Sequence, residues 1–151
     1  MDKVLIKTIE YLDILPIWKY HLWPNRTTPI EPNSGMLFLK GHAIQNMHTT
    51  PTFFGYFFED KLVGVNSGHM CFDNTYRSRG LYVCSEYRSK GIGKELLMAT
   101  IRQGFKENAN FVWSYPRFTS KATYESAGFI ICSEWYETEQ GMNAFCAIGN
   151  S

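Results

Sequence analysis

A short stretch near the middle of the chain constrains the fold more than any other feature. An apolar run at 80–83 is followed by two glycines, Gly91 and Gly93, and apolar residues then recur at positions 92, 96, 97, 101 and 105. This spacing predicts a helix over 92–105 with one buried face, ending near Gly104 and the asparagines at 108 and 110. A strand, a glycine-containing turn and a helix in this order favour a sheet with helices packed against it.

The patterns on either side extend this prediction to a mixed α/β fold. The polar pair Asp60-Lys61 predicts a hairpin, Pro116 ends a late strand, and residues 139–141 form a turn before the last strand. Thr119 or Ser120 is a candidate N-cap, and Gly128 stands at the C-cap position. The order favours a mixed sheet with helices on its faces over an all-α or all-β fold. Strands are expected within 3–10, 52–59, 61–72, 77–84, 109–116, 129–137 and 142–149, and further helices within 12–22 and 119–127.

The segment 23–51 breaks these patterns. It has three prolines and a glycine within its first thirteen residues, which predicts a long irregular segment. Loops of this length in a compact domain often carry function. The run 36–41 inside it fits either a short strand or the start of a helical turn running towards Met47. The 151 residues as a whole fit a single domain, 1–151.

Composition narrows the classes of function. The net charge is +1, which gives no general attraction to phosphate backbones and disfavours nucleic acid as the partner. The four cysteines are widely spaced, so neither a zinc site nor a redox motif is indicated, and reduced thiols are the simpler interpretation. No stretch reaches the length of a membrane span, and the N-terminus does not resemble a signal peptide. The sequence therefore predicts a cytoplasmic protein without a metal.

The glycine-containing turn has a chemical interpretation. Backbone N–H groups at the first turn of a helix lack partners, and the helix dipole adds partial positive charge, so an anion is stabilised there. Gly91 and Gly93 permit close approach, and Arg88, Lys90 and Lys94 supply cations. The turn therefore suits a phosphate, although a helix that merely begins in a basic, solvated loop has the same pattern. The dinucleotide-binding fingerprint and the Walker A motif are both absent.

Two motifs together resemble a known family. Residues 88–93, RSKGIG, match the pyrophosphate-binding pattern Q/R-x-x-G-x-G/A, and residues 124–129, YESAGF, are similar to Y-E-K-x-G-F. Both belong to the GNAT superfamily of N-acetyltransferases, which the chain resembles over about 52–149. The resemblance implies the GNAT fold, a mixed and mostly antiparallel sheet of about six or seven strands, splayed around the cofactor-binding strand. It also implies acetyl-CoA as the co-substrate.

The resemblance assigns roles to individual residues. Strand separation after Val83 would admit the thioester, and Tyr124 would protonate the departing thiolate, although an aromatic residue that only packs its helix fits the same position. Backbone groups of Leu81, Tyr82 and Val83 would bond the pantetheine arm, and those of Arg88, Ser89, Lys90, Gly91, Ile92, Gly93 and Lys94 would surround the pyrophosphate.

The chain also departs from the family pattern. Arg117 replaces a common asparagine, and Arg77 stands where some relatives have a glutamate that serves as general base. Deprotonation of the amine would then pass through water, His69 or Glu86, although a lone strand histidine is more often structural. Cys84 is interpreted as structural, because no partner for a nucleophilic thiol is visible.

The sequence says less about the acceptor of the acetyl group than about its donor. Arg77 and Arg79 alternate along a strand and so share a face, where they would hold a carboxylate or phosphate of the substrate or form a solvated strand end. The segment 23–51 lies where relatives shape their acceptor pocket. The predicted reaction is transfer of acetyl to a primary amine of a small molecule or protein. The alternatives are a non-catalytic CoA- or partner-binding module and a base-modifying enzyme; a homodimer through exposed strand edges near the C-terminus is also expected.

Overall fold

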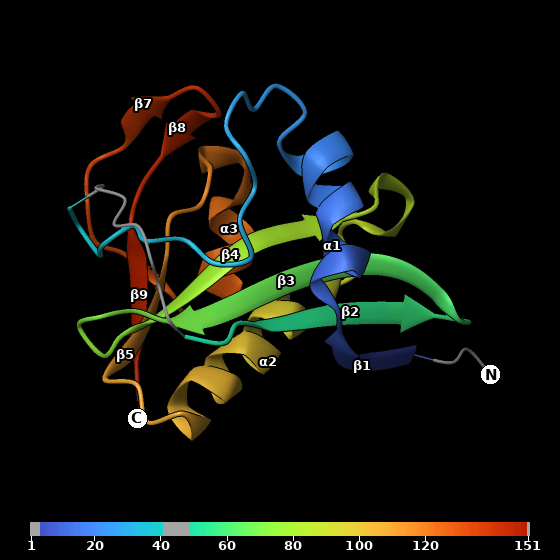
Figure 1. Cartoon of the computed structure of the whole chain (residues 1–151), viewed down its shortest axis with the longest axis horizontal. Helices are drawn as coiled ribbons and strands as arrows, with labels where there is room; N and C mark the ends of the chain where they lie inside the picture. Colours follow the sequence, from blue (N-terminus) through green and yellow to red (C-terminus); the bar gives the residue numbers. More distant parts are fainter. Residues whose placement is uncertain (1–3, 41–48, 151) are drawn as a thin grey trace.

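The computed structural model describes residues 4–40 and 49–150 (Figure 1). Its main sheet has seven strands in the order β1-β2-β3-β4-β5-β9-β6, and β7 and β8 pair separately. The predicted α/β class and the mixed, mostly antiparallel sheet are confirmed. The elements are β1 (Val4–Ile9), α1 (Tyr11–Ile17), η1 (Trp18–Leu22), β2 (Thr52–Phe58), β3 (Lys61–Met70), β4 (Tyr76–Val83), η2 (Ser85–Tyr87), α2 (Ile92–Lys106), β5 (Phe111–Ser114), η3 (Phe118–Ser120), α3 (Lys121–Ser126), β6 (Ile130–Ile131), β7 (Tyr136–Thr138), β8 (Gly141–Asn143) and β9 (Cys146–Gly149).

Helices cover both faces of the sheet (Figure 1). On one face, Ile14 and Trp18 of α1 and η1 pack against Phe53 of β2. On the other, Leu96 of α2 packs against Phe54. Phe53 and Phe54 are neighbours in the chain, and alternating side chains of a strand point to opposite faces. The aromatic run at the start of β2 therefore serves two cores, which explains why it is continuously apolar rather than alternating.

The last two predicted strands are each divided. Residues 129–137 form β6 and β7, and residues 142–149 form β8 and β9. β6 pairs with β9 in the main sheet, whereas β7 and β8 form a hairpin apart from it (Figure 1). The prediction of two continuous strands was wrong because each run crosses from the main sheet to this hairpin, a change that the hydrophobic pattern does not mark.

Other local predictions hold with adjusted boundaries. The β2–β3 hairpin is confirmed, and its turn residues are Glu59 and Asp60, both with positive φ. The predicted 12–22 helix contains Pro16 and continues from α1 into the π-helical turn η1. Ser120 is the N-cap of α3, as predicted.

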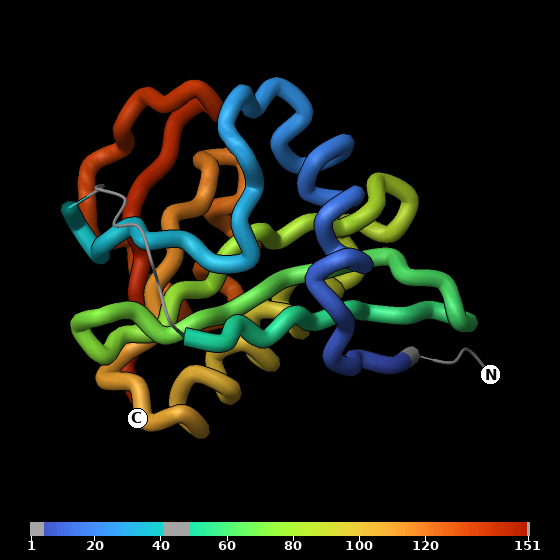
Figure 2. The backbone as a smooth tube through the Cα atoms, viewed as in Figure 1, coloured from blue at the N-terminus to red at the C-terminus, as the bar shows by residue number. Residues whose placement is uncertain are grey.

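The segment 23–40 is irregular, as predicted, and crosses over β4 (Figure 2). Arg79 of β4 donates a hydrogen bond to the Glu31 carbonyl, 2.7 Å away. Phe38 packs edge-on against Phe145 next to β9. Leu37–Lys40 forms a turn rather than a strand, and the remainder of that prediction, up to Met47, lies outside the described residues.

The sheet opens beside β4. The parallel pairing of β4 with β5 is limited to Tyr76 with Val112 and Arg77 with Trp113. The expected strand separation therefore exists, but it begins at Ser78 rather than after Val83. Beyond that point the β5-facing edge of β4 has no strand partner, which leaves room for a ligand along it.

Three side chains satisfy the β4 carbonyls where the sheet opens. Ser114 Oγ donates to the carbonyl of Ser78 at 2.6 Å, Ser67 Oγ to that of Arg79 at 2.8 Å, and Trp18 Nε1 to that of Gly80 at 2.8 Å. Ser114 and Trp18 belong to β5 and η1, whereas Ser67 lies on β3, which pairs with the other edge of β4; together the three bonds satisfy these carbonyls.

A β-bulge accompanies this opening. Between the pairs Ser67–Arg79 and Val65–Tyr82, β4 has one residue more than β3. Gly80 sits in the bulge with φ of 81°, and a Cβ there would lie 2.3 Å from the Trp18 ring. Only glycine fits this conformation and this contact. The bulge shifts the alternation of β4, so that Arg79 and Tyr82 both pack with the aromatic residues of η1 and the segment after it.

Candidate active site

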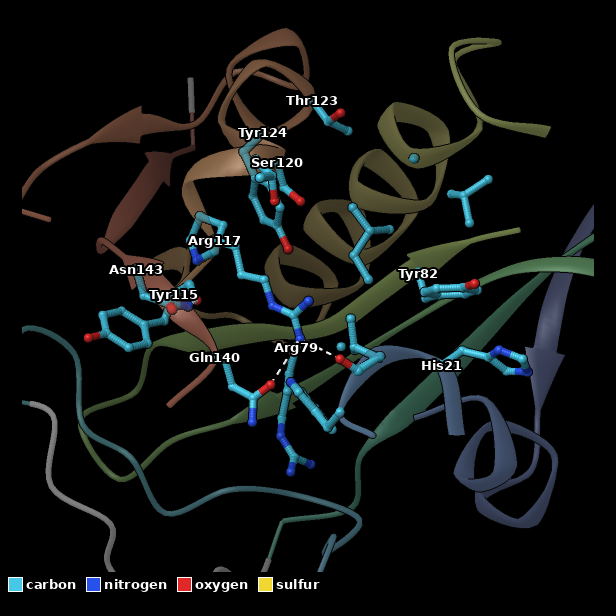
Figure 3. A pocket seen from close by; sticks show the side chains of 18 of the residues that line it. His21, Arg79, Tyr82, Tyr115, Arg117, Ser120, Thr123, Tyr124, Gln140 and Asn143 are labelled. Atoms are coloured by element: carbon cyan, nitrogen blue, oxygen red, sulfur yellow. Dashed lines mark hydrogen bonds between the residues drawn. The ribbon is translucent and has the colours of Figure 1, made fainter. Parts of the chain in front are cut away.

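One large cavity runs along the open edge of β4 (Figure 3). Its volume is about 1120 Å³, slightly larger than the range of about 300–1,000 Å³ that is common for small-molecule sites. We call its two ends the helix end, lined by Gly91 to Lys94 at the start of α2, and the arginine end, lined by Arg26, Arg77, Arg79 and Arg117. Tyr124 also lines the cavity. The space is sufficient for a long ligand together with a second molecule.

The helix end is formed by the first turn of a fifteen-residue helix. Gly91 is the N-cap, with φ of 82°, and Ser89 in the same turn has φ of 62°. The first-turn N–H groups have no partners within the helix, and the dipole adds positive charge. A Cβ built on Gly91 meets nothing within 4 Å, so this backbone is open to a ligand. Such a turn can bind a phosphate group.

Gly93 has a different role in the same turn. A Cβ at this position would lie 2.9 Å from the Thr123 methyl group of α3. Gly93 therefore permits α2 and α3 to approach each other closely, and this contact places the start of α2 beside the helix that carries Tyr124. The two predicted motifs, far apart in the sequence, meet here.

The structure brings together most of the residues expected to hold acetyl-CoA. Lys90 is the exception, because its exposed side chain does not line the cavity. Arg88 folds back over the Tyr82 ring, and its Nε donates to the Val83 carbonyl at 2.8 Å. That carbonyl is thus occupied by a side chain of the turn. The lining residues from the predicted set are Leu81, Tyr82, Val83, Arg88, Ser89, Gly91, Ile92, Gly93 and Lys94.

Tyr124 points from α3 into the cavity (Figure 3). Its side chain is only 4% exposed. Burial raises the pKa of Tyr124 above its usual value, against the opposite effects of the Ser114 hydroxyl and of the charges on Arg77 and Arg117. The phenol therefore stays protonated at neutral pH and can donate a proton.

Arg77 and Arg79 share one face of β4, as their alternation predicts. They are 9% and 4% exposed, so a solvated strand end does not describe them. Arg77 Nη1 donates to Ser34 Oγ at 2.8 Å. Burial, together with repulsion from Arg26, lowers the pKa of Arg77 to about 10; for Arg79, burial and repulsion from Arg77 and Arg26 lower it to about 9. Both remain charged at neutral pH.

Arg117 closes the other side of the arginine end. It donates to the Leu22 carbonyl and, at 3.3 Å, to Gln140 Oε1 in the β7–β8 turn (Figure 3). Burial lowers the pKa of Arg117. This arginine thus connects η1 with the β7–β8 hairpin across the cavity.

The two residues considered as alternatives to water for the general base lie elsewhere. Neither His69 nor Glu86 lines the cavity. His69 is fully buried on β3, with Nε2 3.0 Å from the Ser34 carbonyl oxygen. Burial, with the charges of Arg77 and Arg79 acting in the same direction, lowers the pKa of His69 to about 3. A group this acidic in its protonated form is a poor proton acceptor at neutral pH.

Several residues that line or support the cavity carry no signal in the sequence. Trp18, which supports Gly80 and stacks on Arg79, lies in an ordinary helical pattern. Ser34 and Gln140 lie in a loop and a turn whose partners are more than forty and more than twenty residues away. Their roles depend on contacts between distant segments, which local patterns do not encode.

Other kinds of site find no support in the described ranges. Across residues 4–40 and 49–150, His, Cys, Asp and Glu side chains do not gather in groups of three that could hold a metal ion. Within the same ranges, no helix has the length and apolar character needed to cross a membrane.

Comparisons with known proteins agree with this geometry. The model of the Acetyltransferase (GNAT) family matches residues 17–129, and the chain belongs to this family. Among solved structures, ElaA from Escherichia coli is 15% identical with a TM-score of 0.68, covering 97% of this chain and 99% of its own. A GNAT-family acetyltransferase from Staphylococcus aureus Mu50 is 16% identical with a TM-score of 0.67, covering 97% and 99%.

A third similar structure contains a ligand. It is an acetyltransferase from Bacillus subtilis in complex with CoA, 14% identical with a TM-score of 0.63, covering 99% of this chain and all of its own. At these identities the likeness concerns the fold. A search of curated proteins found no match.

Proposed function

We propose that this protein transfers the acetyl group of acetyl-CoA directly to a primary amine. The observation that carries the proposal is the single cavity that joins the first turn of α2, the open edge of β4 and the phenol of Tyr124. A phosphate-binding turn and a proton donor on one unpaired strand edge suit a long phosphorylated thioester. The complex of the B. subtilis acetyltransferase with CoA shows that a protein of this fold binds such a ligand.

Each part of the cavity has a task in this reaction. The N–H groups at the start of α2, with Arg88 and Lys94, would bind the pyrophosphate. The backbone of Leu81 on the open edge of β4 would extend the sheet towards the pantetheine arm, whereas the backbone of Tyr82 faces β3, where it pairs with Val65. Acetyl-CoA supplies the activated acetyl group, as a thioester, between the helix end and the arginine end. Tyr124 lies where the departing sulfur would need a proton.

The transfer balances with the groups present. The neutral amine attacks the thioester carbonyl, the C–N bond forms and the C–S bond breaks. Tyr124 gives its proton to the thiolate, and the amine releases one proton to water, from which Tyr124 is reprotonated. Neither His69 nor Glu86 lines the cavity, so water is the proposed proton acceptor. The neutral phenol carries the proton that the thiolate needs, and the charges on Arg77 and Arg117 oppose the rise of its pKa that burial causes.

The two alternatives predict different behaviour. A non-catalytic module would bind CoA without turnover, and the position of Tyr124 in the cavity favours catalysis instead. A base-modifying enzyme would need cations that reach a nucleic-acid backbone. Arg77 and Arg79 are buried within the cavity, which favours a small acceptor or a flexible end of a protein chain.

Calorimetric titration of acetyl-CoA tests the cofactor assignment. We expect binding in the micromolar range by the wild type, and binding weaker by about 100-fold or more in Gly91→Glu, since a carboxylate placed beside a phosphate costs several kcal/mol. The Cβ of residue 91 meets open space, so the substitution adds charge without a clash.

Gly141→Glu is the matched control for this titration. Gly141 also has positive φ, 103°, and open space at its Cβ, but it is the first residue of β8. The control reproduces the backbone strain and the charge at a distance from α2, and it should bind acetyl-CoA like the wild type. A folded wild type that does not bind acetyl-CoA would rule out the proposed function.

A further inference from the structure

The arginine end holds four arginines whose charge nearby carboxylates offset only in part: Glu139 lines the same cavity and Glu31 raises the pKa of Arg79, but neither forms an ion pair with these arginines. Within the described ranges the one ion pair joins Lys121 and Glu125 on α3, so none of the four arginines of the arginine end is paired with a carboxylate. Residues 41–48, outside those ranges, contain no aspartate or glutamate in their sequence. Unpaired charge in a buried site is costly and is usually matched by a partner of opposite sign.

Two of these arginines also have donors to spare. Arg77 donates through Nη1 to Ser34, and its Nε is buried without a hydrogen-bond partner among the described residues. Arg79 donates through Nη1 to the Glu31 carbonyl. A guanidinium group has five N–H donors, so most of them stay available. Carboxylates and phosphates are the acceptors that match this planar fork.

Aromatic rings fix the orientation of both groups. The Arg79 guanidinium lies 4.9 Å from the Trp18 ring centroid and 5.2 Å from that of Trp23. The Arg77 guanidinium lies 5.2 Å from the Trp113 ring centroid. Stacked guanidinium groups lose little freedom when they bind an anion, so the site is already organised for one.

The charges repel one another. Arg26 and Arg77 both lower the pKa of Arg79, and Arg26 lowers that of Arg77, in addition to the effect of burial. Like charges held together in a buried cavity are typical of functional sites. An anion bound between them would remove the repulsion and satisfy the open donors at the same time.

This anion is distinct from the phosphates expected at the helix end. Arg77 and Val83 are six residues apart on β4, which is about 20 Å along a strand. The start of α2 lies beyond Val83. By contrast, Tyr124 is close enough to Arg77 and Arg117 for their charges to lower its pKa. The arginine end therefore borders the place of acetyl transfer on the side opposite the donor.

We propose that the acceptor is a small amine that carries an oxyanion, a carboxylate or a phosphate, near its amino group, and that Arg77 and Arg79 bind this oxyanion. The proposal rests on the proposed function and names its substrate class. Amino acids and aminoalkyl phosphates have this chemistry. The oxyanion would hold the molecule at the arginine end while its amine reaches the acetyl group beside Tyr124.

Matched pairs of acceptors test this proposal. The rate of CoA release is measured with phenylalanine against phenethylamine, with glutamate against 4-aminobutyrate, and with phosphoethanolamine against ethanolamine. Phenylalanine has a carboxylate beside the amine that phenethylamine lacks, glutamate has the same additional carboxylate relative to 4-aminobutyrate, which keeps only the distant one, and phosphoethanolamine has a phosphate that ethanolamine lacks. In each pair, the anionic member is the one with the additional oxyanion. We expect at least one anionic member to exceed its partner by about 100-fold or more in kcat/KM, because its partner leaves buried donors unpaired. Which pair responds distinguishes carboxylate from phosphate.

Charge-conserving variants locate the effect. Arg77→Lys and Arg79→Lys keep the charge but lose the planar fork of the guanidinium group. The ratio of kcat/KM for the anionic acceptor over that for its partner should therefore fall by about 10-fold or more in each variant. Arg102→Lys, on the exposed side of α2 outside the cavity, is the matched control and should keep the preference. Neutral amines that react as well as their anionic partners would overturn the proposal, as would a preference unchanged in both cavity variants.

A binding measurement covers the case in which none of these acceptors is acetylated. Side-chain N–H signals of arginine are followed by NMR while acetate or inorganic phosphate is added to the CoA-saturated protein. Saturable shifts of the Arg77 and Arg79 signals support the oxyanion site, and their absence overturns it. Because acetyl-CoA binding is tested separately with Gly91→Glu, failure of this inference is distinguishable from failure of the proposed function.

Discussion

The two ends of the cavity are built in different ways. At the helix end, the groups that face the ligand are largely backbone N–H groups, and they come from the single stretch 88–94. At the arginine end, they are side chains from β4, from the segment 23–40, from Arg117 at the start of η3 and from the β7–β8 hairpin (Figure 3). One end is local in the chain, and the other is assembled from distant parts.

This difference indicates which end of the cavity suits a ligand shared by the family and which suits a ligand particular to this protein. A backbone site needs only a helix start and small residues, so it suits a ligand group common to many relatives. A side-chain site depends on which residue stands at each of several distant positions. The helix end is therefore the expected place of the shared donor, and the arginine end that of an acceptor particular to this protein.

The largest predicted effect is a loss of activity on substitution of Tyr124, which lies between the two ends of the cavity. Tyr124→Phe removes the proposed proton donor and should lower kcat by about 100- to 10,000-fold, the usual range for general acid catalysis. Acetyl-CoA affinity should stay near the wild-type value, because the helix end is unchanged. Steady-state kinetics and calorimetry on the same preparation measure both. Tyr20→Phe, at a 65% exposed position, is the control, and an undiminished kcat would exclude the assigned role.

A second test concerns the support of the arginine end. Trp18→Phe removes the donor to the Gly80 carbonyl and part of the ring over Arg79. The free energy of unfolding should fall by about 2–4 kcal/mol, from an unsatisfied buried carbonyl and lost packing. Urea denaturation measures this change. Trp135→Phe, whose indole makes no hydrogen bond to the described residues, should cost much less, and equal losses would contradict the role of Trp18.

Acid should lower the stability of the folded protein through His69, which is buried next to Arg77 and Arg79 of the arginine end. The pKa of His69 is about 3 in the folded protein and near 6.5 in an unfolded chain, so between these values the unfolded chain binds the extra proton. Stability therefore falls as pH drops from 6.5 towards 3, by about 2 kcal/mol between pH 7 and pH 5 from this group alone. Urea denaturation across this range measures the slope, and it should be shallower in His69→Gln. An identical slope would show that His69 does not set it.

The smallest effect concerns packing at the helix end. Gly93→Ala places a methyl group 2.9 Å from the Thr123 methyl and should lower the free energy of unfolding by about 1–3 kcal/mol. Thr123→Ser removes that methyl group and keeps the hydroxyl. The double variant should recover most of the loss in urea denaturation. If it does not, the close approach of α2 and α3 is not what requires glycine at this position.

One expectation about assembly stays a prediction. β6 is the last strand of the sheet, and Ile130 on it is 71% exposed. An exposed apolar residue on an edge strand is consistent with the homodimer expected from the sequence. Sedimentation of the wild type and of Ile130→Lys would show whether this edge joins two copies.

The sequence by itself determined the α/β class, the glycine turn and the pairing of the two motifs. These features depend on short-range patterns, namely strand alternation, helical spacing and glycine at a helix start. Nine of the ten residues that the family resemblance assigns to the cofactor, together with Tyr124, line one cavity, and their roles stay predictions.

Only the tertiary structure decided the rest. The bulge at Gly80, the division of the last strands and the gathering of four arginines that form no ion pair with the described carboxylates all depend on contacts between segments far apart in the chain. Arg77 and Arg79 in the sequence are equally consistent with a solvated strand end. Their burial beside Trp113, Trp18 and Trp23 gives them a ligand-binding environment, because a charge acquires its energetic role from what surrounds it.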